Sequence, residues 1–462
     1  MMDLATRTLN RLGQQLRGRL TLPGDDHYAE ATSIWAKPTG AMPRAVVRCR
    51  TPEDVQLAIR AARHCDLPVS VRGGGHDWAG RALCAGVVID MSAMNHVTLS
   101  ADNRVARISG GALASDLVAM TDVCGVAAVT GSVGAIGMTG LTLGGGYGPL
   151  IGRFGLALDN LLFAEVVLAD GRIVVAKHDQ ERELFWALRG GGGNFGVVTA
   201  MHHRLHDLPQ VRSGILIFPF AEARSVLERC TEIMAGAPEA LAAQLGIISG
   251  PNGAPLVFAA LTWCGQPDQG EAQIAPFRKI GKLLADTVRM IRYGAALAAF
   301  DDYLVDGQRV FMETCWLPTL DRDSIDVFIA AMEIAPSQGC AIVTHELKGA
   351  ATRVPSEETA FAMRQHHVLV EILATFADHG DRLEEGHHQR WARDTRLAFN
   401  AALPGGYPNI LAPGDTERAT QSYGANAVRL ARAKRRYDPD NVFHSAIPLP
   451  LPVVAAAPVA PN

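Results

Sequence analysis

The stretch Val69-Ser-Val-Arg-Gly-Gly-Gly-His-Asp-Trp-Ala-Gly80 decides the fold, because a β-branched strand runs straight into three glycines and a histidine. Residues without a Cβ let the backbone approach a bulky anion, and successive N–H groups in a tight turn form an anion-binding nest. His76 stands at the mouth of this nest. Taken alone, a glycine run before a histidine is equally compatible with a plain surface loop.

Two further glycine clusters, Gly137–Gly148 and Gly190–Gly196, lie in the same half of the chain. The segment 130–148 is too rich in glycine to be a stable helix or strand throughout. Such backbone is expected where a chain passes close to a flat, extended ligand. The second cluster also contains the spacing G-x-G-x-x-G, but that fingerprint needs a strand before it and a helix after it. Here we expect helix, loop, strand, and therefore no Rossmann dinucleotide site.

The 462-residue chain is too long for one ordinary core and predicts two domains or a large composite one. Its content of 48% hydrophobic and 19% charged residues is typical of a soluble globular protein, and a net charge of −4 gives no general attraction to nucleic acid or an anionic membrane. We find no signal peptide and no run of about 18 apolar residues. The eight cysteines form no Cys-x-x-Cys pair, which indicates reduced cytoplasmic thiols and no metal site.

Periodicity and turn residues predict the elements of the first half. Thr51 and Pro52 should open a helix, and Asp170-Gly171 should join two strands as a hairpin. Helices are expected at 1–19, 112–124 and 181–188. Strands are expected at 45–49, 69–72, 87–90, 104–108, 161–168, 172–176 and 196–205.

Beyond Pro209 the glycine clusters stop and an α+β pattern begins. Its expected helices are 221–235, 269–284, 324–332 and 382–403, and its expected strands are 256–263, 310–317, 340–347 and 368–376. A basic helix should follow at 416–436. The Pro/Ala-rich segment 448–462 is predicted to be a disordered tail.

Six motifs together resemble the FAD-linked oxidases of the vanillyl-alcohol oxidase superfamily, specifically the berberine-bridge-enzyme-like branch that includes bacterial 6-hydroxy-D-nicotine oxidase-type enzymes. They run in the family's order over nearly the whole chain. The motifs are Arg72-Gly-Gly-Gly-His76, Gly140-Leu-Thr-Leu-Gly-Gly-Gly-Tyr-Gly148, Leu158-Asp-Asn-Leu-Leu162, Leu184-Phe-Trp-Ala-Leu-Arg-Gly-Gly-Gly-Gly-Asn-Phe-Gly-Val-Val-Thr199, Gly406-Tyr-Pro-Asn409 and Tyr437-Asp-Pro-Asp-Asn-Val-Phe443.

The resemblance implies an α+β fold in which a PCMH-type FAD-binding domain of two α/β subdomains (1–208) precedes an inserted substrate domain (209–404). The inserted domain should carry an antiparallel sheet backed by helices, and 405–447 should return to the FAD domain. His76 matches the histidine attached to the flavin 8α-methyl group, and a neutral imidazole has a free nitrogen for that bond. The implied FAD contacts are Arg72, Gly73, Gly74, Gly75, His76, Asp77, Gly131, Ser132, Ile136, Gly137, Gly140, Gly144, Gly145, Gly196, Val198, Tyr407, Asn409 and Asn441.

The chain departs from the family's pattern at three positions. A second tether through cysteine is absent, because Ser132 and Val133 occupy that place, so we expect a single covalent link. Ile410 stands where alcohol- and sugar-oxidising relatives carry a tyrosine base. Ile136 falls where relatives place the residue thought to gate oxygen, and its bulk predicts slow reoxidation by O2.

The proton chemistry has several candidates. Tyr407, beside Asn409, could act as a base, which would require its pKa to fall by about 3 units. Alternatively it packs against the flavin and only hydrogen-bonds the substrate. Strand alternation predicts that Glu346, His367 and Glu371 face the flavin if helices cover the apolar faces, although each could instead be solvated or salt-bridged. His345, on the apolar face, is expected to be a core histidine.

The sequence thus predicts a cytoplasmic FAD-dependent oxidoreductase, monomeric or homodimeric, that transfers hydride from a small organic substrate to flavin N5. The substrate could be an amine, an N-heterocycle, an alcohol or a natural-product intermediate of secondary metabolism. O2 or another acceptor would reoxidise the flavin. The alternatives are a catalytically weak FAD-binding protein of the same fold and a carbohydrate or alcohol oxidase. Neither a nucleic acid nor a membrane is an expected partner.

Overall fold

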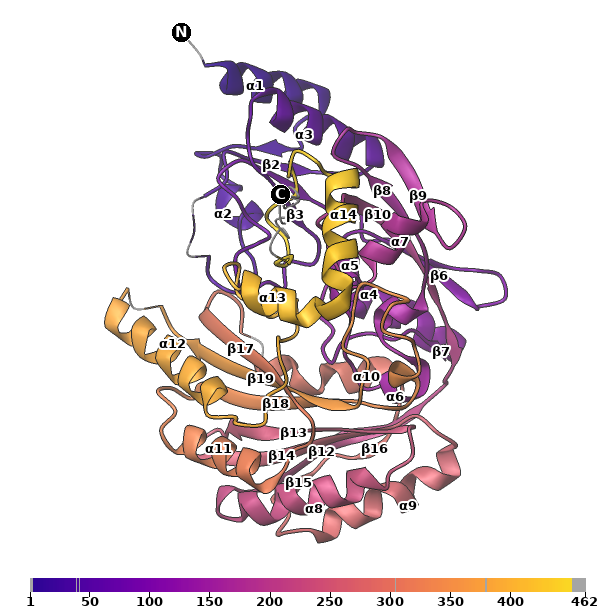
Figure 1. Ribbon diagram of the computed structural model, residues 1–462, viewed down its shortest axis with the longest axis vertical. Helices are drawn as coiled ribbons and strands as arrows, with labels where there is room; N and C mark the ends of the chain where they lie inside the picture. Colours follow the sequence, from indigo (N-terminus) through magenta and orange to yellow (C-terminus); the bar gives the residue numbers. More distant parts are fainter. Residues whose placement is uncertain (1–2, 39, 41, 304, 379, 451–462) are drawn as a thin grey trace, which may run out of the picture.

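The computed structural model describes residues 3–38, 40, 42–303, 305–378 and 380–450. It confirms the mixed α+β fold, which is built around two smaller sheets in the first half of the chain and one large sheet in the second (Figure 1). Most of the predicted tail, 451–462, lies outside the described residues.

A four-stranded sheet of order β1-β2-β4-β3 holds the first glycine loop at the end of β3. Its strands are β1 (Leu20–Thr21), β2 (Ala45–Arg48), β4 (Val87–Asp90) and β3 (Val69–Arg72), and the last three are parallel. The helices α1 (Leu4–Gln15) and α3 (Pro52–His64) bury their apolar faces against it. As predicted, the Thr51 hydroxyl caps α3 by accepting a hydrogen bond from the Asp54 N–H, 3.3 Å away.

An antiparallel sheet of order β5-β6-β10-β8-β9 carries the remaining glycine loops. Its strands are β5 (Val97–Leu99), β6 (Val105–Ser109), β10 (Val197–Arg204), β8 (Leu161–Val167) and β9 (Ile173–Lys177). The predicted hairpin at Asp170-Gly171 is confirmed, with φ of +86° at the glycine. The associated elements are α4 (Ala114–Thr121), α5 (Met138–Gly144), α6 (Ile151–Phe154), α7 (Arg182–Leu188) and the pair β7 (Val126–Ala127) with β11 (His206–Asp207). The short helix α2 (Tyr28–Ala31) instead packs near Val46 and Val88 of the four-stranded sheet.

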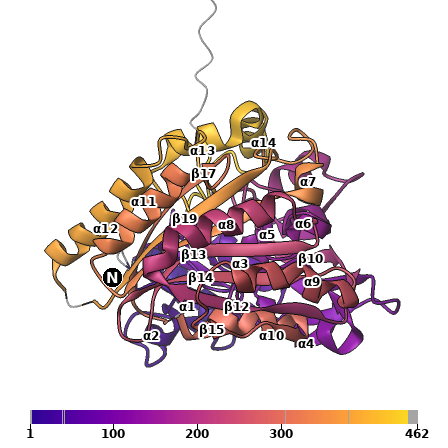
Figure 2. The same cartoon turned by 90° about the horizontal axis from the view of Figure 1, so that it is seen from below.

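The large sheet has the order β15-β12-β14-β13-β18-β19-β17, with β16 also pairing with β12. Its strands are β12 (Val211–Pro219), β13 (Leu241–Ser249), β14 (Pro255–Trp263), β15 (Ala285–Asp286), β16 (Arg289–Ile291), β17 (Arg309–Leu317), β18 (Gly339–Leu347) and β19 (His367–Phe376). Helices α8 (Ala223–Ala235), α11 (Arg322–Glu333) and α12 (Arg382–Leu397) cover its outer face (Figure 2). The inner face is therefore turned toward the first half of the chain, which lies above it in Figure 1.

The C-terminal segment returns to the first half through α13 (Thr416–Tyr423) and α14 (Ala427–Tyr437). The Tyr423 hydroxyl donates to the Gly190 carbonyl over 3.1 Å, and the Lys434 ammonium donates to the Asn194 carbonyl over 2.9 Å. These hydrogen bonds from the return segment stabilise the glycine loop that connects α7 to β10. The expected single helix is interrupted at Gly424, whose φ of +47° does not continue an α-helix.

In the second half, one predicted helix was wrong and several elements were missed. The helix expected at 269–284 ends early, as α9 (Gly270–Ile274) and a short 3-10 turn, because Pro276 lacks the N–H that an α-helix needs. Strands β12 and β13 were missed. The first carries Gly214 and the second begins Leu-Ala-Ala-Gln, and glycine and alanine have weak strand propensity. The α10 helix (Tyr293–Leu297) was also not foreseen.

A buried ion pair joins the two halves. The Arg364 guanidinium donates to both carboxylate oxygens of Asp159 over 2.9 Å, and their side chains are 4% and 9% exposed. Asp159 belongs to the motif after α6, whereas Arg364 precedes β19. Because both charges are removed from water, each depends on the other.

Replacing Arg364 by Met should lower the free energy of unfolding by about 3–5 kcal/mol, because Asp159 would be left buried without its partner. The matched control is Arg172→Met, which removes an ion pair with Asp170 whose side chains are 66% and 49% exposed. That change should cost less than about 1 kcal/mol. Denaturant titration measures both, and similar losses in the two variants would contradict the assignment.

Candidate active site

One large cavity lies between the glycine-rich loops and the inner face of the large sheet, and we call it the main cavity. Its volume is about 870 Å³. The loop after β3, the segment around α5 and the loop before β10 form one wall. Strands β13, β18 and β19 form the other, and residues 407–410 and 443–447 of the return segment complete it. The cavity therefore joins the predicted cofactor loops to the large sheet.

Two glycine loops meet back to back at the cavity wall. A Cβ placed on Gly74 would lie 2.5 Å from the Gly137 Cα, and a Cβ on Gly137 would lie 2.5 Å from the Gly74 nitrogen. Any larger residue would push these loops apart. Gly75 has φ of +73°, a conformation that glycine adopts without strain. The loop 73–77 lines the main cavity, and its role as a phosphate-binding turn stays a prediction.

Gly140 and Gly193 also line the cavity, but they are not needed for close packing between protein segments. A Cβ on either would meet no protein atom within 4 Å. Gly140 lies inside α5, where glycine costs about 1 kcal/mol relative to alanine. Glycine at position 140 therefore destabilises the helix, although no neighbouring protein atom would clash with a larger residue. This is expected if a flat ligand lies directly against this wall. An FAD molecule is such a ligand, so this wall fits the cofactor.

Other residues predicted to contact FAD lie at or near the cavity in different ways. Ser132, Ile136, Gly196 and Val198 line it. Gly131 packs against the side chains of Ile136 and Leu141, which themselves line it. The Asp77 carboxylate accepts from the N–H groups of Ala79 and Ala82, and so it also shapes its own loop.

Four residues have surroundings that differ from the expectation of direct FAD contact. The Arg72 guanidinium donates to the Ala31 carbonyl over 3.2 Å. A Cβ on Gly144 would overlap the Asn409 amide, and a Cβ on Gly145 would lie 3.0 Å from the Tyr407 ring, so these glycines admit the return segment. Asn441 is exposed, with φ of +52°, because it forms the turn after α14. It does not line the main cavity, and its FAD contact stays a prediction.

His76 is buried, and burial lowers its pKa to about 4. Its imidazole is therefore neutral near pH 7, which is the form that carries a free nitrogen lone pair. The ring stacks on the Trp35 indole, with centroids 4.3 Å apart and planes inclined by 15°. The sequence did not single out Trp35.

Tyr407 has both oxygen lone pairs occupied. Its hydroxyl oxygen accepts from the Gly146 N–H and from the Asn409 side-chain amide, each over 3.0 Å. Burial raises its pKa to about 12, in spite of these two donors. Of the two roles left open by the sequence, the base would require a pKa shift in the opposite direction. The phenol instead keeps its proton and can donate it to a ligand.

Tyr147 and His367 form a closed pair beside Tyr407. The His367 Nδ1 lies 2.8 Å from the Gln365 carbonyl, which can only accept, so Nδ1 carries the proton. Its Nε2 then accepts from the Tyr147 hydroxyl over 2.7 Å. Burial lowers the pKa of His367 to about 4 and raises that of Tyr147. His367 therefore acts as a neutral support for Tyr147, whose ring packs edge-on against Tyr407.

The register of β18 and β19 separates the two glutamates. Val343 pairs with Glu371, and Glu371 lines the main cavity. Glu346 pairs with Val368 on the opposite face, where it accepts from His366 and forms an ion pair with Lys348. The prediction that Glu346 and Glu371 face the flavin together was wrong, because alternation along antiparallel partners places them on different faces.

His345 faces the main cavity, so its prediction as a core histidine was also wrong. Its Nε2 lies 3.2 Å from the Gln244 amide nitrogen and 3.6 Å from the Glu371 carboxylate. The inner sheet face thus carries a polar cluster of Gln244, His345 and Glu371. Its neighbours on the same strand face, Val343 and Leu347, are apolar, so strand alternation gave no signal for a polar site at this position.

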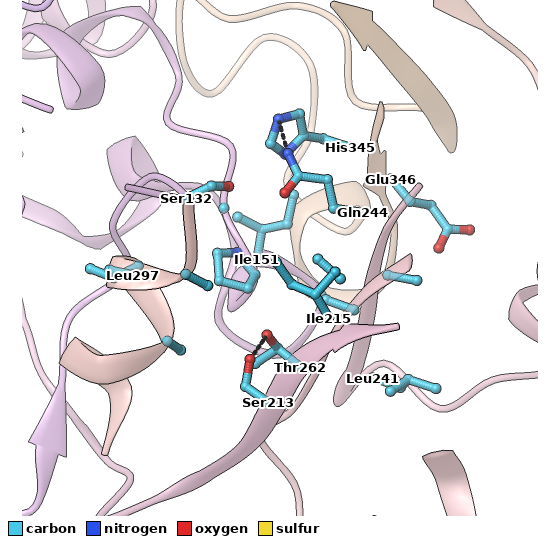
Figure 3. A pocket seen from close by; sticks show the side chains of 18 of the residues that line it. Ser132, Ile151, Ser213, Ile215, Leu241, Gln244, Thr262, Leu297, His345 and Glu346 are labelled. Carbon is cyan, nitrogen blue, oxygen red and sulfur yellow. Dashed lines mark hydrogen bonds between the residues drawn. The ribbon is translucent and has the colours of Figure 1, made fainter. Parts of the chain in front are cut away.

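A small hollow of about 50 Å³ adjoins the cluster on the side of β12 and α10. Figure 3 shows Gln244 and His345 meeting at one side of it, and Ser213 and Thr262 meeting at another. Ser132, Gln244 and His345 line both spaces, so the hollow adjoins the main cavity. Glu346 and Lys348 also line the hollow, but neither lines the main cavity.

Comparisons with known proteins agree with this geometry. Residues 43–177 match the family model described as FAD binding domain, and residues 405–450 match the one described as berberine and berberine like. The FAD-linked oxidoreductase YvdP of Bacillus subtilis is 30% identical over 438 residues, which cover 93% of this chain and 97% of that protein. The (R)-6-hydroxynicotine oxidase of Paenarthrobacter nicotinovorans is 28% identical over 93% of this chain and 95% of its own.

Solved structures share the fold. The crystal structure of 6-hydroxy-D-nicotine oxidase from Arthrobacter nicotinovorans superposes with a TM-score of 0.83 at 28% identity, covering 92% of this chain and 96% of that one. The xylooligosaccharide oxidase from Myceliophthora thermophila has a TM-score of 0.83 at 22% identity, covering 96% and 100% respectively. The latter likeness shows the fold alone.

The fold and the site define a flavoprotein oxidoreductase, with FAD as its cofactor. The chain belongs to the berberine-bridge-enzyme-like family of FAD-linked oxidoreductases, with a PCMH-type FAD-binding domain and the family's C-terminal segment. Among the described residues, no helix is both long and apolar enough to cross a bilayer.

Replacing Gly140 tests whether the absence of a side chain at this position is needed for FAD binding. Gly140→Ala should raise the thermal midpoint of the flavin-free protein, because alanine favours the helix by about 1 kcal/mol. Gly140→Val should weaken FAD retention at least tenfold, because its branched side chain enters the space of the ligand. Differential scanning fluorimetry and ultrafiltration with added FAD measure the two effects. Full FAD retention by the Val variant would contradict this role.

Proposed function

We propose that this enzyme carries FAD covalently through His76 alone and oxidises a small amine at a carbon next to nitrogen. O2 or another acceptor would take up the electrons. The observation that carries the substrate class is Glu371, a carboxylate on the wall of the main cavity. Among the described residues that line the main cavity itself, Arg81 is the sole lysine or arginine, and its guanidinium donates to the Asn409 carbonyl, 2.5 Å away. A cationic or basic substrate is therefore favoured over an anion.

When bound, FAD supplies the hydride-accepting N5 atom, and the chain's residues supply everything else. Glu371 would accept a hydrogen bond from the substrate's ammonium group and take the proton that leaves the nitrogen. Tyr407, which remains protonated, would donate a hydrogen bond rather than remove a proton. Ile410 lines the cavity where alcohol-oxidising relatives place their base, and this further supports an amine.

We also propose that the chain divides into an FAD domain (1–208), a substrate domain (209–404) and a return segment (405–447). The large sheet begins at Val211, which supports the first boundary. Ile136 lines the cavity, and its bulk supports slow reoxidation by O2. The eight cysteines are unpaired, which supports a cytoplasmic location. A role in secondary metabolism, and action as a monomer or homodimer, remain part of the proposal.

The covalent link is tested by acid precipitation of the purified enzyme. Yellow colour should stay with the pellet of the unmodified protein and pass into the supernatant for His76→Ala. The control is His366→Ala, because His366 is half exposed and bonded to Glu346 on the other face of the sheet. Free FAD in the supernatant of the unmodified protein would contradict the link without affecting the family assignment.

The role of Glu371 is tested with Glu371→Gln. The rate of anaerobic flavin bleaching by an amine substrate, divided by substrate concentration, should fall about 10- to 100-fold, since a hydrogen bond to a charged group is worth about 1.5–3 kcal/mol. Glu346→Gln is the matched control and should stay within about twofold.

A screen of amines and neutral alcohols should show bleaching by amines. Equal effects of the two glutamate variants would overturn the assignment of Glu371. Bleaching by alcohols alone would favour the alcohol-oxidase alternative. No bleaching by any compound would favour the weak FAD-binding protein.

A further inference from the structure

Trp35 reaches His76 from a segment that belongs to neither the β3 loop nor the large sheet. It follows α2, and its backbone connects two distant parts of the chain. The Trp35 N–H donates to the Gly75 carbonyl over 2.9 Å, and the Gly307 N–H donates to the Trp35 carbonyl over 2.8 Å. Ala36 also forms a bridge with Gln308. The backbone of Trp35 is therefore held by hydrogen bonds to both halves of the molecule.

The contact between Trp35 and His76 is a flat stack, with ring centroids 4.3 Å apart and planes inclined by 15°. A stack of this kind covers one face of the imidazole and restricts rotation about its side-chain bonds, while both ring nitrogens stay at the uncovered edge. Both residues line the main cavity. The Trp35 Nε1 atom is buried and has no hydrogen-bond partner among the described residues, so no competing polar contact turns the indole away.

We propose that Trp35 is the positioning residue for flavin attachment: its indole fixes the plane of the His76 imidazole so that a ring nitrogen faces the flavin 8α-methyl carbon. This inference rests on the proposed covalent link. In the net reaction, one N–C bond forms, the methyl group loses one hydrogen and the imidazole loses its N–H hydrogen. The corresponding two electrons reduce O2 to H2O2, so oxygen is the oxidant that the step consumes.

Orientation is the reason to expect a large effect from this contact. A misplacement of about 1 Å between reacting groups can slow a reaction about 100-fold. Loss of the flat contact leaves the imidazole nucleophilic but free to rotate. Attachment should therefore slow, whereas reversible FAD binding should persist, because the glycine wall that fits FAD is on other segments.

The test compares planar with non-planar replacements. Trp35→Phe and Trp35→Tyr keep a flat ring, whereas Trp35→Leu and Trp35→Met keep apolar bulk without one. Each protein is produced under riboflavin limitation, and its flavin-free fraction is incubated with FAD in air. Covalent flavin is followed by fluorescence in denaturing gels, and total bound FAD by ultrafiltration. His76→Ala sets the zero level.

Attachment should be within about threefold of the unmodified rate in the Phe and Tyr variants and at least tenfold slower in the Leu and Met variants, with total FAD binding retained. Equal rates in all four variants, or an order that follows size rather than planarity, would overturn the proposal. Loss of FAD binding in both non-planar variants would also overturn it, because Trp35 would then build the cavity. Absence of covalent flavin in the unmodified protein would instead identify failure of the proposed link.

Discussion

The close approach of Gly74 to Gly137 is the constraint on which the rest of the site depends. With 2.5 Å between the position of a Cβ and the facing backbone, no side chain can stand between these loops. The loop after β3 and the segment before α5 consequently form one continuous wall. His76 emerges from that wall, and Gly140 continues it as open surface. The glycines thus have two roles, since some let the protein pack on itself and others leave room for the cofactor.

The return segment completes the site from the other end of the chain. Trp78 donates through its indole nitrogen to the Ile410 carbonyl over 3.1 Å, which connects the His76 loop to residues 407–410. Gly144 and Gly145 make space for Asn409 and Tyr407, and the Gly146 N–H then bonds to the Tyr407 hydroxyl. The glycine cluster around α5 therefore shapes the place of Tyr407 as well as the cavity wall. Because both lone pairs of that hydroxyl are occupied, its remaining capacity is to donate a proton in a hydrogen bond.

The inner sheet face contributes the charges of the site. Glu371 and His345 lie on adjacent strands and face the same cavity, with Gln244 from β13 beside them. Glu346, one residue after His345, lies outside the main cavity, where it accepts a hydrogen bond from His366 and forms an ion pair with Lys348. The register of β18 and β19 therefore places the Glu371 carboxylate in the main cavity, where it can contact a substrate. The same register places the Glu346 carboxylate in an ion pair with Lys348. Glu346 therefore serves as a control for the effect of removing a carboxylate charge from this sheet.

The sequence alone determined the α+β fold, the capped helix after Thr51, the hairpin at Asp170-Gly171 and the glycine loops, because those features depend on local backbone preferences. It also identified the FAD family through six ordered motifs. Only the tertiary structure decided which strand residues face the cavity, because that depends on how β18 pairs with β19 and on which face the helices cover. For the same reason it alone revealed Trp35, since a stack on His76 joins residues that are 41 positions apart and share no local pattern.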